Sequence, residues 1–269
     1  MTYVPSSPEE VEFLNTYDPV KYAAAAFTAD IVMLTFRNGE LSVLLVKRGG
    51  YPYKDCWALP GGFVNADEDA DQAARRELAE ETNITVDKVH LEQIRTYSTP
   101  GRDPRMRIIS TAYLALLPEV GNPLAGDDAA EAHFFPVKDI LNPQDEEDAI
   151  QLAFDHEVIL RDGLERAASK LEYTPLATAF LEEPFTLADL RRVYETVWGT
   201  ALHAANFRRK VLSTPNFVVP VGDKGESQFA GGRSADLYRS GTAELLHPAI
   251  LRKGLDAGIH DESKEEGGL

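Results

Sequence analysis

Acidic side chains are concentrated between residues 62 and 84 in a pattern that can bind a metal ion. Glu77, Glu80 and Glu81 are spaced so that, on a helix, all three carboxylates share one face. Like charges at these spacings destabilise an isolated helix, and a divalent cation among them would offset that repulsion. Carboxylate oxygens suit Mg²⁺ or Mn²⁺, which also bind substrate phosphates. The pattern favours such a cation site over the alternative of a solvated acidic helix face.

Two neighbouring features would support this site. Gly61 and Gly62 precede the predicted helix, and glycine allows the backbone to come close to a ligand. Arg76 can hold a neighbouring carboxylate, such as that of Glu68, in place. We therefore expect both glycines to line the substrate-binding site.

Four arginines are candidates for binding a phosphate group. Arg102, Arg105 and Arg107 cluster between two predicted strands, at the start of the second, and Arg48 ends an earlier strand. Arginine can bind phosphate oxygens through two parallel hydrogen bonds. We predict that these four residues bind substrate, although a charged hairpin tip would show the same pattern.

The elements that must position these residues indicate an α+β fold with a mixed sheet. Two apolar, β-branched runs flank Asn38-Gly39, and because both residues tolerate positive φ, this pair predicts a tight hairpin. The expected elements are a helix at 7–17, strands at 26–36 and 40–48, a short strand and glycine loop at 57–64, a helix at 69–82, strands at 89–99 and 106–117, and a strand with a turn at 131–141.

Periodicity and composition divide the chain into parts. Residues 1–145 form the first predicted domain. Apolar residues at helical spacing predict a long linker helix over 146–171. Residues 172–253 form a second, smaller domain, and the Gly-rich, acidic tail 254–269 is predicted to be disordered.

The second domain has the order of elements typical of a winged helix-turn-helix. Thr186 can cap a helix that ends at Gly199, a basic helix follows at 203–213, and a two-stranded ribbon with a Gly-rich tip completes the unit. A helical cap or a dimerisation unit is the alternative. The residues expected to contact DNA are Asn206, Arg208, Arg209, Lys210 and Arg233.

The distribution of charge along the chain supports a DNA-binding role for the second domain. The net charge of the chain is −17, yet residues 184–253 contain ten Lys or Arg against six Asp or Glu. A protein with an acidic body and a mildly basic end would meet phosphate through that end only. No apolar run approaches the roughly 20 residues of a membrane span, and the N-terminus lacks a secretory pattern. A single cysteine, Cys56, excludes an internal disulfide framework, so cytoplasmic residence is the simplest expectation.

The segment GFVNADEDADQAARRELAEETNI resembles the Nudix box. Asn83 replaces the last glycine of that motif, and Asn is the usual substitute in the left-handed conformation expected there. The resemblance implies a Nudix α/β/α sandwich in which Glu77 and Glu81 ligate the metal and Glu80 is a ligand or base. These three glutamates would be catalytic, because bound metal lowers the pKa of the water that attacks a nucleoside diphosphate derivative. The segment Arg102-Asp-Pro-Arg105 resembles one in Nudix proteins that handle ADP-ribose.

The C-terminal domain resembles that of the NrtR-type Nudix-related transcriptional regulators, and the similarity covers about residues 18–250. The resemblance lies in Thr186-Leu187, in the stretch from Leu190 to Glu195, in Asn206-Phe-Arg-Arg-Lys210, and in the segment 170–176. It implies a homodimer that binds operator DNA, with residues 208–210 in recognition-helix positions. It also implies that ADP-ribose binds the Nudix domain and changes operator affinity, and that the regulated genes belong to NAD or pentose metabolism.

Two functions remain open from the sequence. Many such regulators have degraded Nudix boxes, whereas this chain keeps every acidic position and Arg76. A regulator that senses ADP-ribose is favoured, with its hydrolytic activity undecided. The alternative is an ADP-ribose pyrophosphatase whose C-terminal domain serves dimerisation. A non-catalytic scaffold would leave the acidic helix face unexplained.

Overall fold

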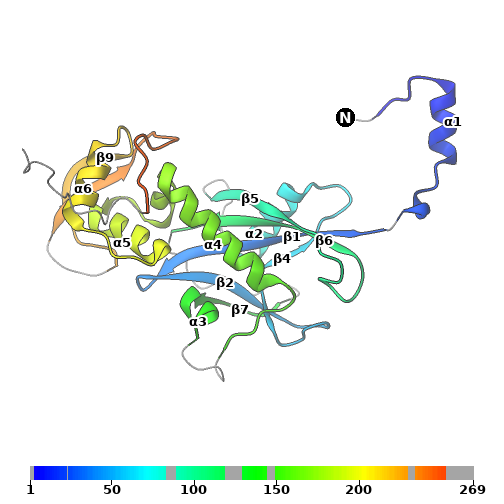
Figure 1. Cartoon of the computed structure of the whole chain (residues 1–269), viewed down its shortest axis with the longest axis horizontal. Helices are drawn as coiled ribbons and strands as arrows, with labels where there is room; N and C mark the ends of the chain where they lie inside the picture. The colour runs from blue at the N-terminus through cyan, green and yellow to red at the C-terminus, as the bar shows by residue number, and fades with distance from the viewer. Residues whose placement is uncertain are drawn as a thin grey trace, which may run out of the picture.

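The protein consists of two units joined by one long helix, α4 (His156–Tyr173) (Figure 1). No helix among the described residues is long and apolar enough to cross a lipid bilayer. The tail at 254–269, predicted to be disordered, lies outside the described residues. The structure, a computed structural model, describes residues 3–22, 24–82, 89–118, 129–143, 149–229 and 234–252.

A mixed sheet forms the body of the larger unit, and its seven strands all lie within the described residues. The first strand, β1, pairs antiparallel with β2 and parallel with β6. The main path runs β3-β2-β1-β6-β5, with β4 paired to β1 and β7 paired to β2. The strands are β1 (Ala26–Arg37), β2 (Glu40–Arg48), β3 (Trp57–Ala58), β4 (Gly61–Phe63), β5 (His90–Tyr97), β6 (Ile108–Leu116) and β7 (Ala129–Pro136).

The predicted hairpin is confirmed. Asn38 and Gly39 have φ values of 52° and 77°, and Arg37 pairs with Glu40 across the turn. Both φ values lie in the left-handed region, which Asn and Gly adopt most readily.

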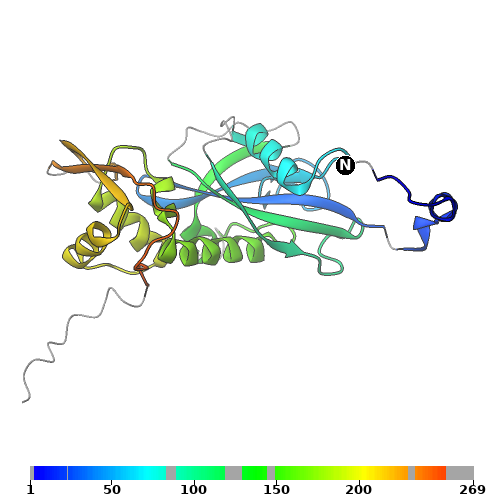
Figure 2. The same cartoon turned by 90° about the horizontal axis from the view of Figure 1, so that it is seen from above.

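Strand β1 is buried on both faces, as expected for a central strand between two layers. Its side chains alternate: Ile31 and Met33 pack in the cluster that contains α2 (Ala70–Thr82), and Val32 and Leu34 pack in the cluster that contains α4. The two helices therefore cover opposite faces of the sheet (Figure 2). This arrangement confirms the α/β/α sandwich with a mixed sheet.

The linker helix begins later than predicted. The sequence pattern places its start at residue 146, but α4 begins at His156. The preceding residues instead pair with the sheet, since Leu152 bridges to Trp57 and the Ala153 amide donates to the Trp57 carbonyl at 2.8 Å. Phe154 then adopts a φ of 56°, which interrupts any helix at that point. Residues 144–148 lie outside the described part of the chain.

Three short helical elements occupy the edges of the larger unit. Ser7 caps α1 (Pro8–Thr16), whose nine residues are all described and all unburied, so this helix projects away from the body (Figure 1). The short helix η1 (Pro19–Lys21) follows it, and α3 (Val137–Leu141) follows β7.

The smaller unit has the predicted helix–turn–helix–ribbon order. A capping box between Thr186 and Asp189 starts the first of its two α-helices, and Gly199, with φ 65°, ends it. The ribbon contains one strand more than predicted, because β8 pairs with β10 ahead of these helices. The elements are η4 (Pro175–Phe180), β8 (Phe185–Thr186), α5 (Leu187–Trp198), α6 (Ala204–Ser213), β9 (Val218–Gly225) and β10 (Ala235–Ser240).

The two units share one apolar core. Phe36, near the tip of the β1–β2 hairpin, packs edge-on against Phe180 and also contacts Phe229 in the ribbon loop, with ring centroids 5.3 Å apart in both pairs. Arg192 of α5 donates to the Gly39 carbonyl at 3.4 Å. The smaller unit is therefore held both by α4 and by the hairpin.

Candidate functional site

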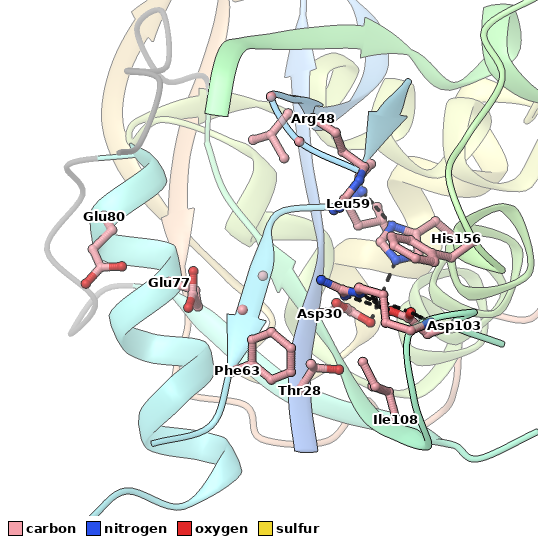
Figure 3. Close-up of a pocket in the computed structure, with 18 of the residues that line it drawn as sticks. Thr28, Asp30, Arg48, Leu59, Phe63, Glu77, Glu80, Asp103, Ile108 and His156 are labelled. Atoms are coloured by element: carbon pink, nitrogen blue, oxygen red, sulfur yellow. Dashed lines mark hydrogen bonds and ion pairs between the residues drawn. The ribbon is translucent and has the colours of Figure 1, made fainter. Parts of the chain in front are cut away.

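A cleft of about 900 Å³ opens between α2, strand β4 and the start of α4. Glu77 and Glu80 of α2 form one wall, and Arg48, Asp103 and His156 lie on the other side (Figure 3). A cleft of this size can enclose a nucleotide-sized ligand. One wall carries carboxylate side chains and the other carries arginine side chains.

The acidic wall is organised by Arg76. Its guanidinium donates to both carboxylate oxygens of Glu68, at 2.7 and 3.1 Å, and to Glu77 Oε1 at 2.7 Å. It also lies 3.3 Å from Glu80 Oε2 and donates to the Phe63 carbonyl at 3.1 Å. The bonds from Arg76 to Glu68, with a hydrogen bond from the Asn65 amide, lower the pKa of Glu68 to about 2. The predicted role of Arg76 in holding Glu68 is confirmed.

Glu77 lies deepest in this wall, with 8% of the residue exposed. Burial raises the pKa of its carboxyl group, because desolvation outweighs the bond from Arg76. Glu80, on the next turn, keeps a largely exposed side chain. The structure thus brings two of the three predicted ligands to the cleft, while the side chain of Glu81 lies outside the described part of the chain.

The two glycines fit tightly between the helix and the sheet. A Cβ atom on Gly62 would lie 2.2 Å from Glu77 Oε1, so the absence of a side chain makes room for that carboxylate. Gly61 has a φ of 150°, and a Cβ there would lie 2.3 Å from the Ala29 carbonyl oxygen of β1. Both glycines line the cleft, but the close approach they permit is to Glu77 and to β1.

The donor set fits a hard divalent cation in type. Glu77 and Glu80 present carboxylate oxygens to the cleft, and the missing side chain of Gly62 makes room for the Glu77 carboxylate. Within the described ranges, no three His, Cys, Asp or Glu side chains gather closely enough to hold a metal ion. The third predicted ligand, Glu81, would have to complete the site.

The opposite wall contains three of the four predicted arginines. Arg48 donates to the Pro52 carbonyl at 2.9 Å, and burial together with the charge of Arg105 lowers its pKa. Arg105 pairs with Asp103 at 2.7 Å and lies 5.7 Å from the centroid of the Phe63 ring. Both side chains line the cleft and can meet an anion there.

Arg102 and Arg107 differ from these two. Arg102 lines the cleft, but its Nε and Nη2 atoms donate to Asp155, at 2.9 and 2.6 Å. Arg107 is not among the described residues that line the cleft. Its Nη1 atom is buried without a hydrogen-bond partner in the described part of the chain.

Several cleft residues were not predicted from the sequence. Asp30, an acid inside an otherwise apolar strand, accepts a hydrogen bond from Ser110 and lies 3.6 Å from Arg102. His156 is buried, and its Nδ1 accepts a hydrogen bond from the Leu59 amide at 2.9 Å. That bond leaves the proton on Nε2, and burial lowers the pKa of the imidazole. The isolated acid in β1 was the one signal available from the sequence.

The basic residues of α6 are arranged as an exposed face. Phe207 and Val211 anchor the helix in the core, and Arg208 and Arg209 are exposed on the other side. Asn206 accepts from Arg209 at 3.4 Å, and Lys210 lies next to this pair in the sequence. Arg208 also lies 3.6 Å from Asp236 of β10. Arg233 falls outside the described residues.

The two glycines allow a test of the acidic wall. In Gly62→Ala, the new methyl group would displace a flexible carboxylate, so we expect Mn²⁺ affinity to fall by about 10-fold or more, with little loss of stability. In Gly61→Ala, the methyl group would meet backbone, so we expect a loss of about 2 kcal/mol in the free energy of unfolding.

Calorimetric Mn²⁺ titration and urea denaturation measure these two quantities. Equal effects of both substitutions on Mn²⁺ affinity, at equal stability, would contradict this description of the wall.

Known protein families match each of the two units. A family model described as NUDIX domain matches residues 26–155, and one described as NrtR DNA-binding winged helix domain matches residues 177–240. The ADPR responsive transcriptional repressor NtrR of Acinetobacter baylyi is 32% identical over 232 residues, which cover 86% of this chain and 88% of that protein.

Two further relatives resemble one or both units. An ADP-ribose pyrophosphatase of Methanocaldococcus jannaschii is 43% identical over 121 residues, which cover 45% of this chain and 64% of that enzyme. The crystal structure of Shewanella oneidensis NrtR complexed with a 27mer DNA matches with a TM-score of 0.66 at 30% identity, over 80% of this chain and 93% of that one. This chain therefore belongs to the NrtR family of Nudix-related transcriptional regulators.

Proposed function

We propose that this protein binds operator DNA through its winged helix and ADP-ribose through its Nudix cleft, and that ADP-ribose changes its affinity for DNA. The regulated genes would belong to NAD metabolism or a related pathway. The A. baylyi relative is named as responsive to ADPR, and it aligns with both units of this chain. The S. oneidensis relative was crystallised with DNA.

The observation that carries the proposal is the pairing of opposite walls in one cleft. Glu77 and Glu80 lie on one side of it and Arg48 on the other (Figure 3), and Arg105 also lines it. A pyrophosphate with a bound divalent cation is complementary to both walls at once, because the cation meets the carboxylates and the phosphate oxygens meet the arginines. Phe63 beside Arg105 adds an aromatic face for a base or ribose.

Each residue would have a separate task in binding. Arg105 and Arg48 would hold the phosphate oxygens, and the cation at Glu77, Glu80 and Glu81 would polarise a phosphoryl group and a water molecule. Arg76 keeps Glu77 in position, and Gly62 makes room for the Glu77 carboxylate. The Nε–Nη2 edges of Arg102 and Arg105 are paired with Asp155 and Asp103, so either edge would have to leave its partner to bind a phosphate.

DNA binding would use the exposed face of α6. Arg208, Arg209 and Lys210 would contact phosphates or base edges, with Asn206 beside them and Arg233 in the ribbon loop. A homodimer would place two such helices on two half-sites of an operator. The ligand would act by favouring one arrangement of the DNA-binding units over another, which requires different ligand affinities in the two arrangements.

An ADP-ribose pyrophosphatase is the second candidate function. The arrangement of Glu68, Arg76, Glu77 and Glu80 around Gly62 favours it, because each of these parts of a hydrolytic Nudix site is in place. The similarity to the M. jannaschii enzyme supports the same reading. In this case the C-terminal unit would serve dimerisation.

Binding is tested with Arg105→Ala. We expect its affinity for ADP-ribose to fall by about 10- to 100-fold, because a charge-assisted phosphate contact is lost. Isothermal titration calorimetry with fixed Mg²⁺ measures this change. Arg161→Ala is the matched control, since Arg161 pairs with Glu157 on α4 and does not line the cleft in the described residues. Equal affinities of both variants would overturn the assigned wall.

Hydrolysis is tested with Glu77→Gln. If the protein is a pyrophosphatase, the wild type releases AMP and ribose 5-phosphate in Mg²⁺, and this variant loses at least about 100-fold in turnover. Chromatography of the products provides the measurement. A wild type that binds ADP-ribose and releases no AMP in Mg²⁺ or Mn²⁺ would exclude the second candidate.

DNA binding is tested with Arg209→Ala. We expect weaker binding to DNA from upstream of the protein's own gene and a salt dependence reduced by about one released counterion. Fluorescence anisotropy over a range of salt concentrations gives both values. Lys138→Ala, in the exposed α3 of the Nudix unit, should leave both unchanged. A wild type that fails to bind this DNA more tightly than random DNA would contradict the proposal.

A further inference from the structure

Helix α4 contacts the cleft at one end and the DNA-binding unit at the other. His156, in its first turn, lines the cleft. At its far end, the Leu171 carbonyl accepts from Tyr194 Oη at 3.1 Å and the Ala168 carbonyl accepts from Trp198 Nε1 at 3.0 Å. The Leu246 amide donates to the Tyr173 carbonyl at 2.8 Å. Helix α4 therefore makes direct contacts with both the cleft and the winged helix.

Asp155 occupies the N-cap position of this helix but does not act as a cap. An N-cap aspartate normally accepts hydrogen bonds from backbone amides of the first turn. Among the described residues, the Asp155 carboxylate accepts no such bond. Both of its oxygens instead accept from Arg102, at 2.6 and 2.9 Å.

Arg102 donates two side-chain hydrogen bonds to Asp155. Its side chain is only 5% exposed, and the next carboxylate, that of Asp30, lies 3.6 Å away. Burial alone would lower its pKa, but the bond to Asp155 and the charge of Asp30 raise it. The guanidinium is therefore a fixed charge beside the place where a pyrophosphate would bind.

The residues around Asp155 also belong to the cleft. Phe154 has a left-handed φ of 56°. The Arg48 Cζ atom lies over the Phe154 ring, 4.8 Å from the ring centroid. A non-glycine residue in this conformation is strained and persists only where its surroundings hold it. The start of α4 is thus held by the same arginine wall that would bind the ligand.

We propose that Asp155 is a positioning residue that competes with the pyrophosphate of the ligand for Arg102. In the free protein Asp155 holds Arg102. In the bound protein Arg102 turns to the phosphate oxygens and Asp155 is released to cap the amides of its own helix. This proposal rests on the proposed function, because it assumes a pyrophosphate ligand and a response at DNA.

The Asp155 carboxylate would have two alternative partners, Arg102 and the amides of its own helix, and so two states. The Nε–Nη2 edge of Arg102 can pair with one anion at a time, so a phosphate group that takes this edge and Asp155 exclude each other there. Asp155 is already placed where helix amides and the helix dipole attract an anion. The ligand thereby gains different affinities for two arrangements of α4, which is the condition for shifting their populations.

The test uses Asp155→Asn in the full-length protein. The ligand probe is an ADP-ribose analogue with a methylene group in place of the bridging pyrophosphate oxygen, so that hydrolysis does not interfere. Removal of the competing charge should tighten analogue binding by roughly 3- to 10-fold. The ratio of operator Kd values with and without analogue, about 5-fold or more in the wild type, should approach one in the variant.

Glu157→Gln is the matched control. It removes the same charge from the same helical turn, but Glu157 is exposed and pairs with Arg161. It should leave both analogue affinity and the operator ratio at wild-type values. If Asp155→Asn does not fold, Asp155→Ser replaces it, since serine can still cap a helix.

The outcomes separate the two proposals. Weaker analogue binding in Asp155→Asn, or an unchanged operator ratio, would overturn the role of Asp155 while leaving the proposed function standing. A wild type that binds no analogue, or whose operator affinity ignores it, would overturn the proposed function itself.

Discussion

The structure depends on a buried ionic cluster where the sheet meets the start of α4. Arg102 lies between Asp155 and Asp30, and His156 Nε2 lies 3.9 Å from the same Asp30 carboxylate. Breaking a buried pair by removing one partner leaves an uncompensated charge, which is strongly destabilising. The cluster therefore fixes the position of α4 on the sheet, and with it the wall of the cleft and the seat of the DNA-binding unit.

The proposed linkage between ligand binding and DNA recognition would depend on the same cluster. The cleft lies at one end of β1 and α4, and the winged helix lies at their other end, against Phe36 and Leu171. Both elements are packed in one continuous core. Close-packed cores transmit displacement because few voids exist to absorb it. Under the proposal, a displacement at Arg102 would reach α5 and α6 through these packed elements.

Much of the fold could be predicted from the sequence because its signals are local. Asn38-Gly39 fixes a hairpin, Thr186 starts α5, and the spacing of Glu77 and Glu80 places them on one helix face. The acidic wall was predicted for the same reason, since its parts lie within one short segment. The order of helices and strands in the C-terminal unit also followed from local patterns.

The opposite wall was predicted less well because its partners are distant in the sequence. Arg102 and Asp155 are separated by 53 positions, so no spacing rule connects them. The late start of α4 has the same origin: Ala153 bonds to Trp57 of the sheet, and this tertiary contact overrides helical periodicity. Arg107 was grouped with Arg105 because the two are close in the sequence. Of these two residues, Arg105 lines the cleft and Arg107 is not among the described residues that do so.

The most direct test measures the affinity of the methylene analogue of ADP-ribose with and without saturating operator DNA. Linkage requires DNA to change ligand affinity by the same factor as ligand changes DNA affinity. We predict equal factors that differ from one, at the same salt concentration. An analogue affinity that is identical in the presence and absence of operator would contradict the account.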